Sequence, residues 1–175
     1  MSSLLFMIIF ILMKCLLLIR HAKSSWGDFT QPDFDRPLNE RGKADAPVMA
    51  NRLLAKKIKI DAFVSSPAKR AKKTCKLFCN EYGVKEDKII FIEKLYLAHA
   101  EMFFEIIKGL DNKYEHVAIF AHNPGITDFA NRLCKEVHID EMPTCGIFSI
   151  EANIEKWKDF KDGENKFLFF DYPKS

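Results

Sequence analysis

The stretch that decides the fold reads Lys14-Cys15-Leu16-Leu17-Leu18-Ile19-Arg20-His21-Ala22. Its first part, 15–19, is a short unbroken apolar run, which is typical of a strand buried on both faces of a sheet. In parallel sheets covered by helices on both faces, ligands bind beyond the carboxyl ends of the strands. Arg20 and His21 follow the run directly, so they belong at the edge of the sheet where a ligand is expected.

Outward from this stretch, apolar runs alternate with helical patterns. Further strands are predicted at 62–64, 89–92, 117–121, 147–150 and 167–170. Helices are predicted at 39–57, 66–82, 101–110 and 123–133. The last two strands are joined by a loop containing Gly163, which favours antiparallel pairing at the edge of the sheet. The order predicts an α/β fold: a single-domain three-layer sandwich with a mostly parallel central sheet and helices on both faces.

Capping residues mark where the helices begin and end. Asn39 is suited to cap the first helix, and Pro47 inside its pattern is expected to kink it or to shift its start. Ser66-Pro67 and Asn123-Pro124 each predict a capping side chain followed by proline in the first helical turn. Gly83 is expected to end the second helix.

Length and charge limit the class of protein. The chain has 175 residues, near the usual size of one domain. Its 27 basic and 24 acidic residues give a net charge of +3, too close to balance to indicate a nucleic-acid-binding protein.

The cysteines and histidines do not form a metal-binding pattern. The five cysteines are odd in number, and no two have the two-residue spacing of zinc or thioredoxin-type motifs. No histidine lies three or four residues from another. These patterns favour reduced thiols in a cytoplasmic protein, and we expect no metal and no other cofactor.

The beginning of the chain is apolar. Leu4–Met13 is an unbroken apolar run, which Lys14 interrupts. The run is short for a membrane span, and the start lacks the basic residues and small-residue cleavage site of a signal peptide. We expect residues 1–12 to be an extension outside the fold, with the domain at 13–175. The alternative is that residues 1–12 anchor the protein at a membrane surface.

Three of the predicted strands end in residues suited to binding an anion. The first ends in Arg20-His21, the second in Ser65-Ser66-Pro67 with Arg70 one turn further, and the fourth in His122-Asn123-Pro124-Gly125. Parallel strands would bring these residues to one rim, next to two helix N-termini. Two guanidinium groups and two imidazoles there predict a cavity for a dianion such as phosphate.

These segments resemble the histidine phosphatase superfamily, which is phosphoglycerate mutase-like in fold. The short length and the segment Arg36-Pro37-Leu38 followed by Arg41-Gly42 are most similar to its SixA-type phosphohistidine phosphatases. Ala22 and Ala121 depart from the pattern, since many members have glycine at these positions. The resemblance covers residues 13 to 150.

The resemblance implies a metal-independent phosphatase that works through a phosphohistidine intermediate. His21 is the implied nucleophile, and it must be neutral to attack phosphorus. Arg20, Arg70 and a charged His122 are the implied ligands of the phosphoryl oxygens. Water then hydrolyses the phosphohistidine formed at His21.

The proton donor for the leaving group is less well defined. Mutase-type members carry a catalytic glutamate after the third strand, and 95–99 shows no equivalent. Asp33 is the first candidate, because its loop lies between the nucleophile and the next helix. Three alternatives remain open: Asp35, Glu101 and His99. A phosphohistidine substrate relaxes the need for a donor, since an imidazole nitrogen leaves more readily than an alkoxide.

The expected partner is a phosphorylated protein, as in signal transduction, or a small phosphorylated metabolite. A small-molecule phosphomonoesterase and a non-catalytic module that binds phosphorylated ligands are the alternative functions. Two further residues have an open role. Trp26 either lines the mouth of the pocket or packs within its loop, and Thr144 lies where it can reach the phosphate site.

Overall fold

The computed structural model describes residues 13–27 and 30–175. The apolar segment 1–12 lies outside the described residues, so its exclusion from the domain stays a prediction. Within the described residues, no helix has the length and apolar character needed to cross a membrane.

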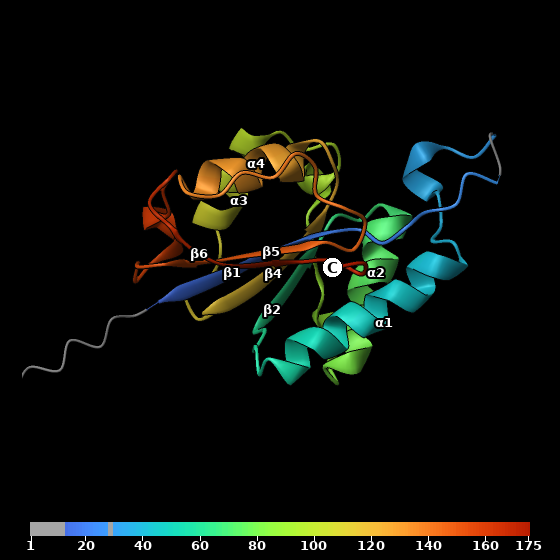
Figure 1. Ribbon diagram of the computed structural model, residues 1–175, viewed down its shortest axis with the longest axis horizontal. Helices are drawn as coiled ribbons and strands as arrows, with labels where there is room; N and C mark the ends of the chain where they lie inside the picture. The colour runs from blue at the N-terminus through green and yellow to red at the C-terminus, as the bar shows by residue number, and fades with distance from the viewer. Residues whose placement is uncertain (1–12, 28–29) are drawn as a thin grey trace, which may run out of the picture.

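The centre of the fold is a six-stranded sheet in the order β3-β2-β4-β1-β5-β6 (Figure 1). Its strands are β1 (Lys14–Arg20), β2 (Ala62–Ser65), β3 (Ile90–Phe91), β4 (His116–Ala121), β5 (Ile147–Ala152) and β6 (Lys166–Asp171). β1 to β4 run parallel to one another. β5 pairs antiparallel with β1, and β6 pairs antiparallel with β5. The mostly parallel sheet with an antiparallel edge is therefore confirmed.

Helices cover both faces of this sheet, as predicted (Figure 1). α1 (Glu40–Ala55) and α2 (Lys69–Glu81) lie on one face, and α3 (Ala100–Lys108) and α4 (Gly125–Leu133) lie on the other. Each layer buries its own hydrophobic cluster against the sheet. This is the three-layer sandwich expected from the sequence.

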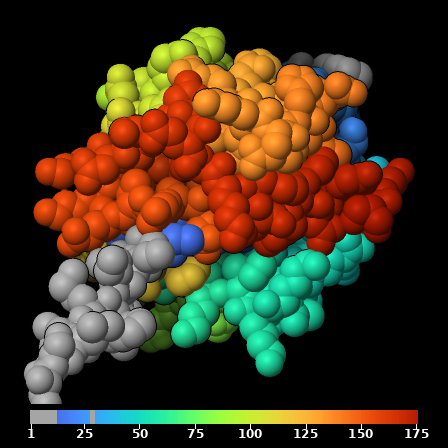
Figure 2. Space-filling view, turned by 60° about the vertical axis from the view of Figure 1, so that its left-hand side comes forward, coloured from blue at the N-terminus to red at the C-terminus, as the bar shows by residue number. Residues whose placement is uncertain are grey.

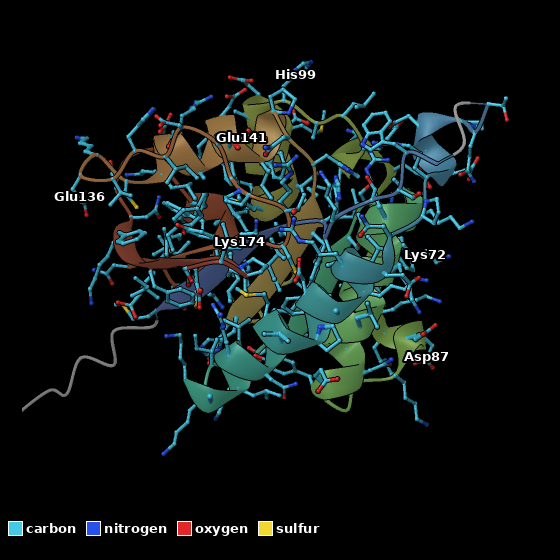
Figure 3. All side chains as sticks on the ribbon, turned by 45° about the vertical axis from the view of Figure 1, so that its right-hand side comes forward. Lys72, Asp87, His99, Glu136, Glu141 and Lys174 are labelled. Atoms are coloured by element: carbon cyan, nitrogen blue, oxygen red, sulfur yellow. The ribbon has the colours of Figure 1, made fainter. Side chains whose placement is uncertain are left out.

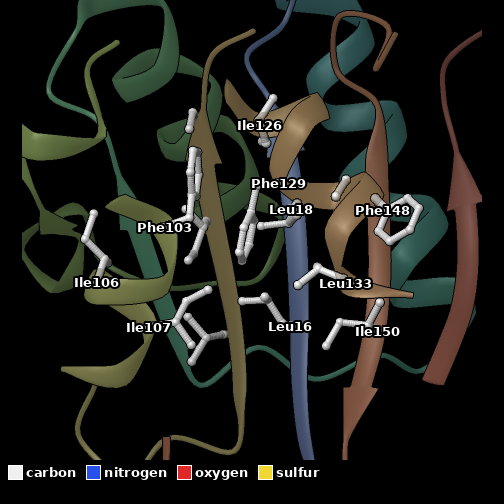
Figure 4. Packing of buried hydrophobic residues seen from close by; sticks show 14 of the residues in the cluster. Leu16, Leu18, Phe103, Ile106, Ile107, Ile126, Phe129, Leu133, Phe148 and Ile150 are labelled. Carbon is white, nitrogen blue, oxygen red and sulfur yellow. The ribbon is translucent and has the colours of Figure 1, made fainter. Parts of the chain in front are cut away.

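The central strand β1 contributes to both hydrophobic clusters. Leu16 and Leu18 face α3 and α4 (Figure 4), whereas Leu17 and Ile19 face α1 and α2. All four side chains are fully buried. Successive side chains point to opposite faces of a strand, so only a continuous apolar run can bury both.

The start of α1 and the end of α2 agree with the predictions. The side chain of Asn39 caps α1 by accepting a hydrogen bond from the backbone N–H of Gly42. Pro47 lies within α1. Gly83 adopts a φ of +66° directly after α2, a conformation that glycine adopts without steric cost.

The predicted starts of α2 and α4 were wrong, because both helices begin later. α2 begins after Ala68, and α4 begins after Pro124, so each proline precedes its helix instead of occupying the first turn. The hydroxyl of Ser66 lies 2.8 Å from Nε2 of His122 and accepts a bond from the N–H of Ala68. It therefore bridges two strand ends instead of capping a helix.

The C-terminal strand closes the antiparallel edge. The red C-terminal segment lies directly against α1 (Figure 2). Arg52 of α1 donates a hydrogen bond of 2.8 Å to the carboxylate of Asp171 and a second one, of 3.1 Å, to the carbonyl of Tyr172. These contacts fasten the end of β6 to α1 at the antiparallel edge of the sheet.

Candidate active site

A cavity of about 320 Å³ lies at the carboxyl ends of β1, β2 and β4. Its lining residues are Arg20, His21, Lys23, Ser24, Trp26, Asp33, Arg36, Arg70, Leu97, His122, Asn123 and Thr144. Size does not distinguish it, since a hollow of about 510 Å³ lies beside Arg52 and Phe169. Its chemistry does, because it gathers three arginines and two histidines.

His21 is held in one protonation state by its neighbours. Its Nε2 lies 3.1 Å from Nε of Arg70, and its Nδ1 lies 2.8 Å from the carbonyl oxygen of Ala22. Arginine only donates and a carbonyl only accepts, so Nδ1 carries the proton and Nε2 offers its lone pair. His21 is therefore a neutral imidazole whose Nε2 faces a guanidinium group.

Electrostatics keep this imidazole neutral. Burial lowers the pKa of His21 from 6.5 to about 3, and the charges of Arg70 and Arg20 act in the same direction. The hydrogen bond to Ala22 opposes them and is outweighed. At neutral pH the ring is unprotonated, which a nucleophilic histidine requires.

His122 lies beside His21, with the two ring centroids 5.1 Å apart. Burial lowers the pKa of His122 to about 2, and the neighbouring His21 and Arg70 add to the effect. His122 is therefore neutral in the free protein, because a third cation in this buried group is unfavourable. Its charged form with a phosphoryl group bound stays a prediction.

Three buried nitrogen atoms of the cavity have no hydrogen-bond partner among the described residues. They are Nε of Arg20, Nη1 of Arg36 and Nδ1 of His122. Buried polar atoms without partners are rare, and each costs free energy unless a partner satisfies it. All three atoms belong to residues that line the cavity, where a bound anion would supply the missing partners.

Arg36 is a residue of the cavity that the sequence analysis quoted without giving it a role. Its side chain is nearly buried, and its Nη2 lies 2.8 Å from the carboxylate of Asp33. Arg36 lies in a loop without apolar periodicity. Nothing local in the sequence therefore indicated that the folded loop turns this guanidinium inward.

Asp33 lies in the cavity as predicted, and three side chains bind its carboxylate. One oxygen, Oδ2, accepts hydrogen bonds of 2.9 Å from Arg70 and from the hydroxyl of Tyr96, while Arg36 binds Oδ1. Burial alone would raise the pKa of Asp33, but the hydrogen bonds from Tyr96 and Arg70 and the arginine charges lower it overall. Asp33 is thus ionised in the free protein, and its role as proton donor stays a prediction.

The three alternative donors do not line the cavity. Glu101 pairs with Arg132 at 2.7 Å on the surface. His99 is exposed at the start of α3 and points away from the fold (Figure 3). Asp35 is exposed and absent from the cavity wall.

Tyr96 is a second residue that sequence reasoning missed. It stands in the segment 95–99, where no equivalent of the mutase glutamate was found. Its hydroxyl donates to Asp33, and its ring packs edge-on against His122 with the centroids 5.7 Å apart. The segment therefore supplies a phenol close to the cavity instead of a carboxylate.

Trp26 and Thr144 both line the cavity. This agrees with the prediction that Trp26 lines the mouth of the pocket and that Thr144 can reach the phosphate site. Trp26 lies with its ring 3.7 Å from the guanidinium carbon of Arg36. The cavity thus has cationic nitrogens at its base and an aromatic ring at its mouth.

A neutral histidine with an unprotonated ring nitrogen, set among arginines at the ends of parallel strands, characterises a class of phosphoryl-transfer proteins. A family model of the histidine phosphatase superfamily (branch 1) matches residues 16–111, more than half of the chain. The chain belongs to this superfamily and is a phosphatase. An uncharacterized chloroplastic protein of Arabidopsis thaliana is 29% identical over 152 residues, covering 82% of this chain and 69% of that protein.

Solved structures share the fold over nearly their whole length. The protein histidine phosphatase SixA in complex with tungstate has a TM-score of 0.76 and 20% identity, covering 91% of this chain and 97% of that one. A protein of Agrobacterium tumefaciens assigned as a phosphohistidine phosphatase SixA has a TM-score of 0.73 and 23% identity, covering 90% of this chain and 96% of that one. A mycobacterial glucosyl-3-phosphoglycerate phosphatase has a TM-score of 0.64 and 15% identity, covering 89% and 97%.

Proposed function

We propose that this protein is a metal-independent, SixA-like protein phosphohistidine phosphatase that forms a phosphohistidine at His21. The observation that carries the proposal is the neutral state of His21, whose Nε2 offers a lone pair at the wall of a cationic cavity. Likeness in fold to SixA structures supports the choice of substrate.

Substrate binding in this proposal uses the unpartnered nitrogens of the cavity. Nε of Arg20, Nη1 of Arg36 and, as the N–H tautomer, Nδ1 of His122 would donate to phosphoryl oxygens. Asp33 is the competing anion, because its carboxylate Oδ2 accepts a hydrogen bond from Nη2 of Arg70, while its backbone carbonyl accepts one from Nη1. A bound dianion would draw Arg70 away from Asp33.

The reaction has two displacements. Nε2 of His21, released from its hydrogen bond with Nε of Arg70, attacks phosphorus, and the bond from phosphorus to the leaving nitrogen breaks with its electron pair on that nitrogen. Water then attacks the phosphohistidine, losing a proton to solvent, and the electron pair of the broken P–N bond returns to Nε2. The arginines oppose the negative charge on the phosphoryl oxygens in both steps.

Replacing the nucleophile tests the proposal directly. We expect His21→Ala to lower kcat on a phosphohistidine-bearing protein by at least about 10³-fold, whereas the exposed control His138→Ala changes it little. Rapid quench of the parent with labelled substrate should trap an acid-labile, alkali-stable adduct on His21. Activity should survive exhaustive chelation. Full activity of His21→Ala, or loss on chelation that added metal restores, would refute the mechanism.

Asp33→Asn tests the proton donor. For a phosphate ester we expect a loss in kcat of about 10²-fold, the usual scale of acid catalysis. A phosphohistidine substrate should lose less, because its leaving nitrogen has less need of a proton. Removing the charge that competes for Arg70 should also tighten inhibition by inorganic phosphate roughly two- to fivefold, the scale of an exposed ion pair. An ester rate that is unchanged or higher would exclude Asp33 as the donor.

The substrate class is decided by comparing turnover across phosphorylated compounds. A phosphohistidine protein, nucleotides, sugar phosphates and phosphoglycerates form the panel. The proposal expects the highest kcat/KM for the phosphohistidine protein. A clear preference for one of the metabolites would replace it with a small-molecule phosphomonoesterase.

A place in cytoplasmic signal transduction follows from this proposal. Support comes from the cysteines, which are all unpaired and mostly buried, as in proteins of reducing compartments. A fluorescent fusion of the full chain that localises outside the cytoplasm would contradict it.

A further inference from the structure

Two exposed apolar side chains stand at the mouth of the cavity. Trp26 and Leu97 are each 62% exposed, more than any other large apolar side chain among the described residues. They come from segments far apart in the sequence and line the same cavity. Exposed apolar groups that gather at a binding site indicate contact with a ligand.

Trp26 has one covered face and one open face. The guanidinium group of Arg36 stacks on its ring at 3.7 Å. The high exposure of the side chain leaves the opposite face of the indole free. A ring fixed in this way is a stacking platform whose orientation is set before the ligand arrives.

Leu97 is held in an unfavourable backbone conformation. Its φ is +54°, in the left-handed region that leucine rarely adopts. Its two neighbours are fixed: Tyr96 donates to Asp33, and the carbonyl of Ala98 lies so close to Gly125 that a Cβ there would come within 1.8 Å. Strain of this kind is concentrated at functional sites, and here it projects an apolar side chain over the cavity.

We propose that Trp26 and Leu97 bind the aromatic ring that carries the phosphoryl group, so that the preferred substrates have a ring as leaving group. The inference rests on the proposed function, for which the ring is the imidazole of phosphohistidine. The two parts of such a substrate match the two parts of the cavity. The unpartnered nitrogens of Arg20 and Arg36 suit the phosphoryl group, and the apolar rim formed by Trp26 and Leu97 suits an uncharged ring. Sugar and alkyl phosphates would leave the rim without a partner.

Binding of two phosphonates that the enzyme does not hydrolyse tests the proposal. Phenylphosphonate carries a ring and methylphosphonate does not, while their phosphonyl groups are alike. Isothermal titration calorimetry on the full chain gives Kd for both in the parent, Trp26→Ala and Leu97→Ala. Val48→Ala is the matched control, because Val48 is exposed on α1 and does not line the cavity.

We expect Trp26→Ala to weaken phenylphosphonate more than methylphosphonate by roughly 3- to 10-fold, the range of one aromatic stack. Trp26→Phe should keep most of the selectivity, and Leu97→Ala should lose part of it. Val48→Ala should match the parent. If Trp26→Ala weakened the binding of both phosphonates equally, Trp26 would only support Arg36, and the proposal would be overturned. Unchanged binding of phenylphosphonate in Trp26→Ala would also overturn it.

The same variants separate this inference from the proposed function. Free phosphohistidine and phosphoramidate both contain a P–N bond, and only the first has a ring. A parent that hydrolyses neither of these compounds nor a phosphohistidine-bearing protein would refute the proposed function, while the phosphonate result would still decide the ring site. If the parent hydrolyses both compounds, Trp26→Ala should lower kcat/KM for free phosphohistidine by a larger factor than for phosphoramidate. Equal factors for the two compounds would overturn the ring site.

Discussion

Arg70 connects the chemical groups of the site at the scale of single residues. Its Nε donates to Nε2 of His21, and its two other nitrogens donate to the backbone and side-chain oxygens of Asp33. The side chain is almost fully buried, and its place near the start of α2 fixes its direction. One planar group thus selects the tautomer of His21, the proposed nucleophile, and binds the carboxylate of Asp33.

Arg70→Lys should therefore lower kcat/KM strongly, although it keeps the positive charge. An ammonium group cannot donate along three fixed directions, so His21 and the phosphoryl group would no longer share one rigid donor. We expect kcat/KM to fall by about 10²- to 10³-fold, the usual effect of removing one donor that stabilises the transition state. Steady-state kinetics should show this loss, while the exposed Arg41→Lys should remain near the parent. Near-parental activity of Arg70→Lys would show that charge alone suffices.

At the scale of elements, helix starts fix the loops that carry the site. The first turn of α1 touches the loop after β1, since a Cβ on Gly42 would come within 2.2 Å of the carbonyl of Lys23. The first residue of α4 touches the loop with Tyr96 in the same way, through Gly125 and Ala98. These backbone contacts set the positions of loops that have no regular structure to hold them.

Gly125→Ala tests this coupling. The added methyl group would meet the carbonyl of Ala98 at 1.8 Å, so α4 and the loop must separate. We expect a loss of about 1–3 kcal/mol in the free energy of unfolding, measured by urea denaturation, and a lower kcat/KM as Tyr96 and Leu97 move. Gly109→Ala is the control, because its nearest contacts are ordinary, at 3.5 Å. Equal effects of the two substitutions would contradict the coupling.

The same elements show which parts of the fold could be predicted from the sequence. The strand at 15–19 and the helices were predictable because their apolar patterns are local and match the period of each structure. The start of α2 was not, because the hydroxyl of Ser66 is engaged by His122, which follows another strand. The start of α4 was not, because the side chain of Asn123 bonds Glu141 and Met142 instead of capping the helix. A long-range contact of this kind leaves no trace in the local pattern.

Some residues of the candidate site were also predictable from the sequence, and others were not. His21, Arg20, Arg70 and His122 follow or lie near strand ends, and the topology of a parallel sheet brought them together as expected. Arg36 and Tyr96 lie in loops without periodicity. Their positions depend on Asp33, which binds both. Asp33 and Arg36 form a local i,i+3 ion pair, but no rule of spacing connects either of them with Tyr96.

For the whole molecule, burial of two histidines makes stability depend on pH. Burial lowers the pKa of His21 to about 3 and that of His122 to about 2, from an ordinary value of 6.5. Below pH 6.5 the unfolded chain binds two protons that the folded protein does not accept until the pH is far lower. The stability is therefore complete above pH 6.5 and declines as the pH falls toward 3.

We predict a fall in the free energy of unfolding of about 2–3 kcal/mol between pH 6 and pH 5, since each histidine contributes about 1.4 kcal/mol per pH unit. Urea denaturation at each pH measures it. The double variant His21→Gln/His122→Gln removes both groups, so its stability should change little over this interval, whereas the exposed control His138→Gln should keep the parental slope. The same slope in the double variant and in the parent would show that other groups control acid stability. Loss of the slope would establish that the neutral histidine pair, which we propose for phosphoryl transfer, is maintained at the expense of the acid stability of the whole fold.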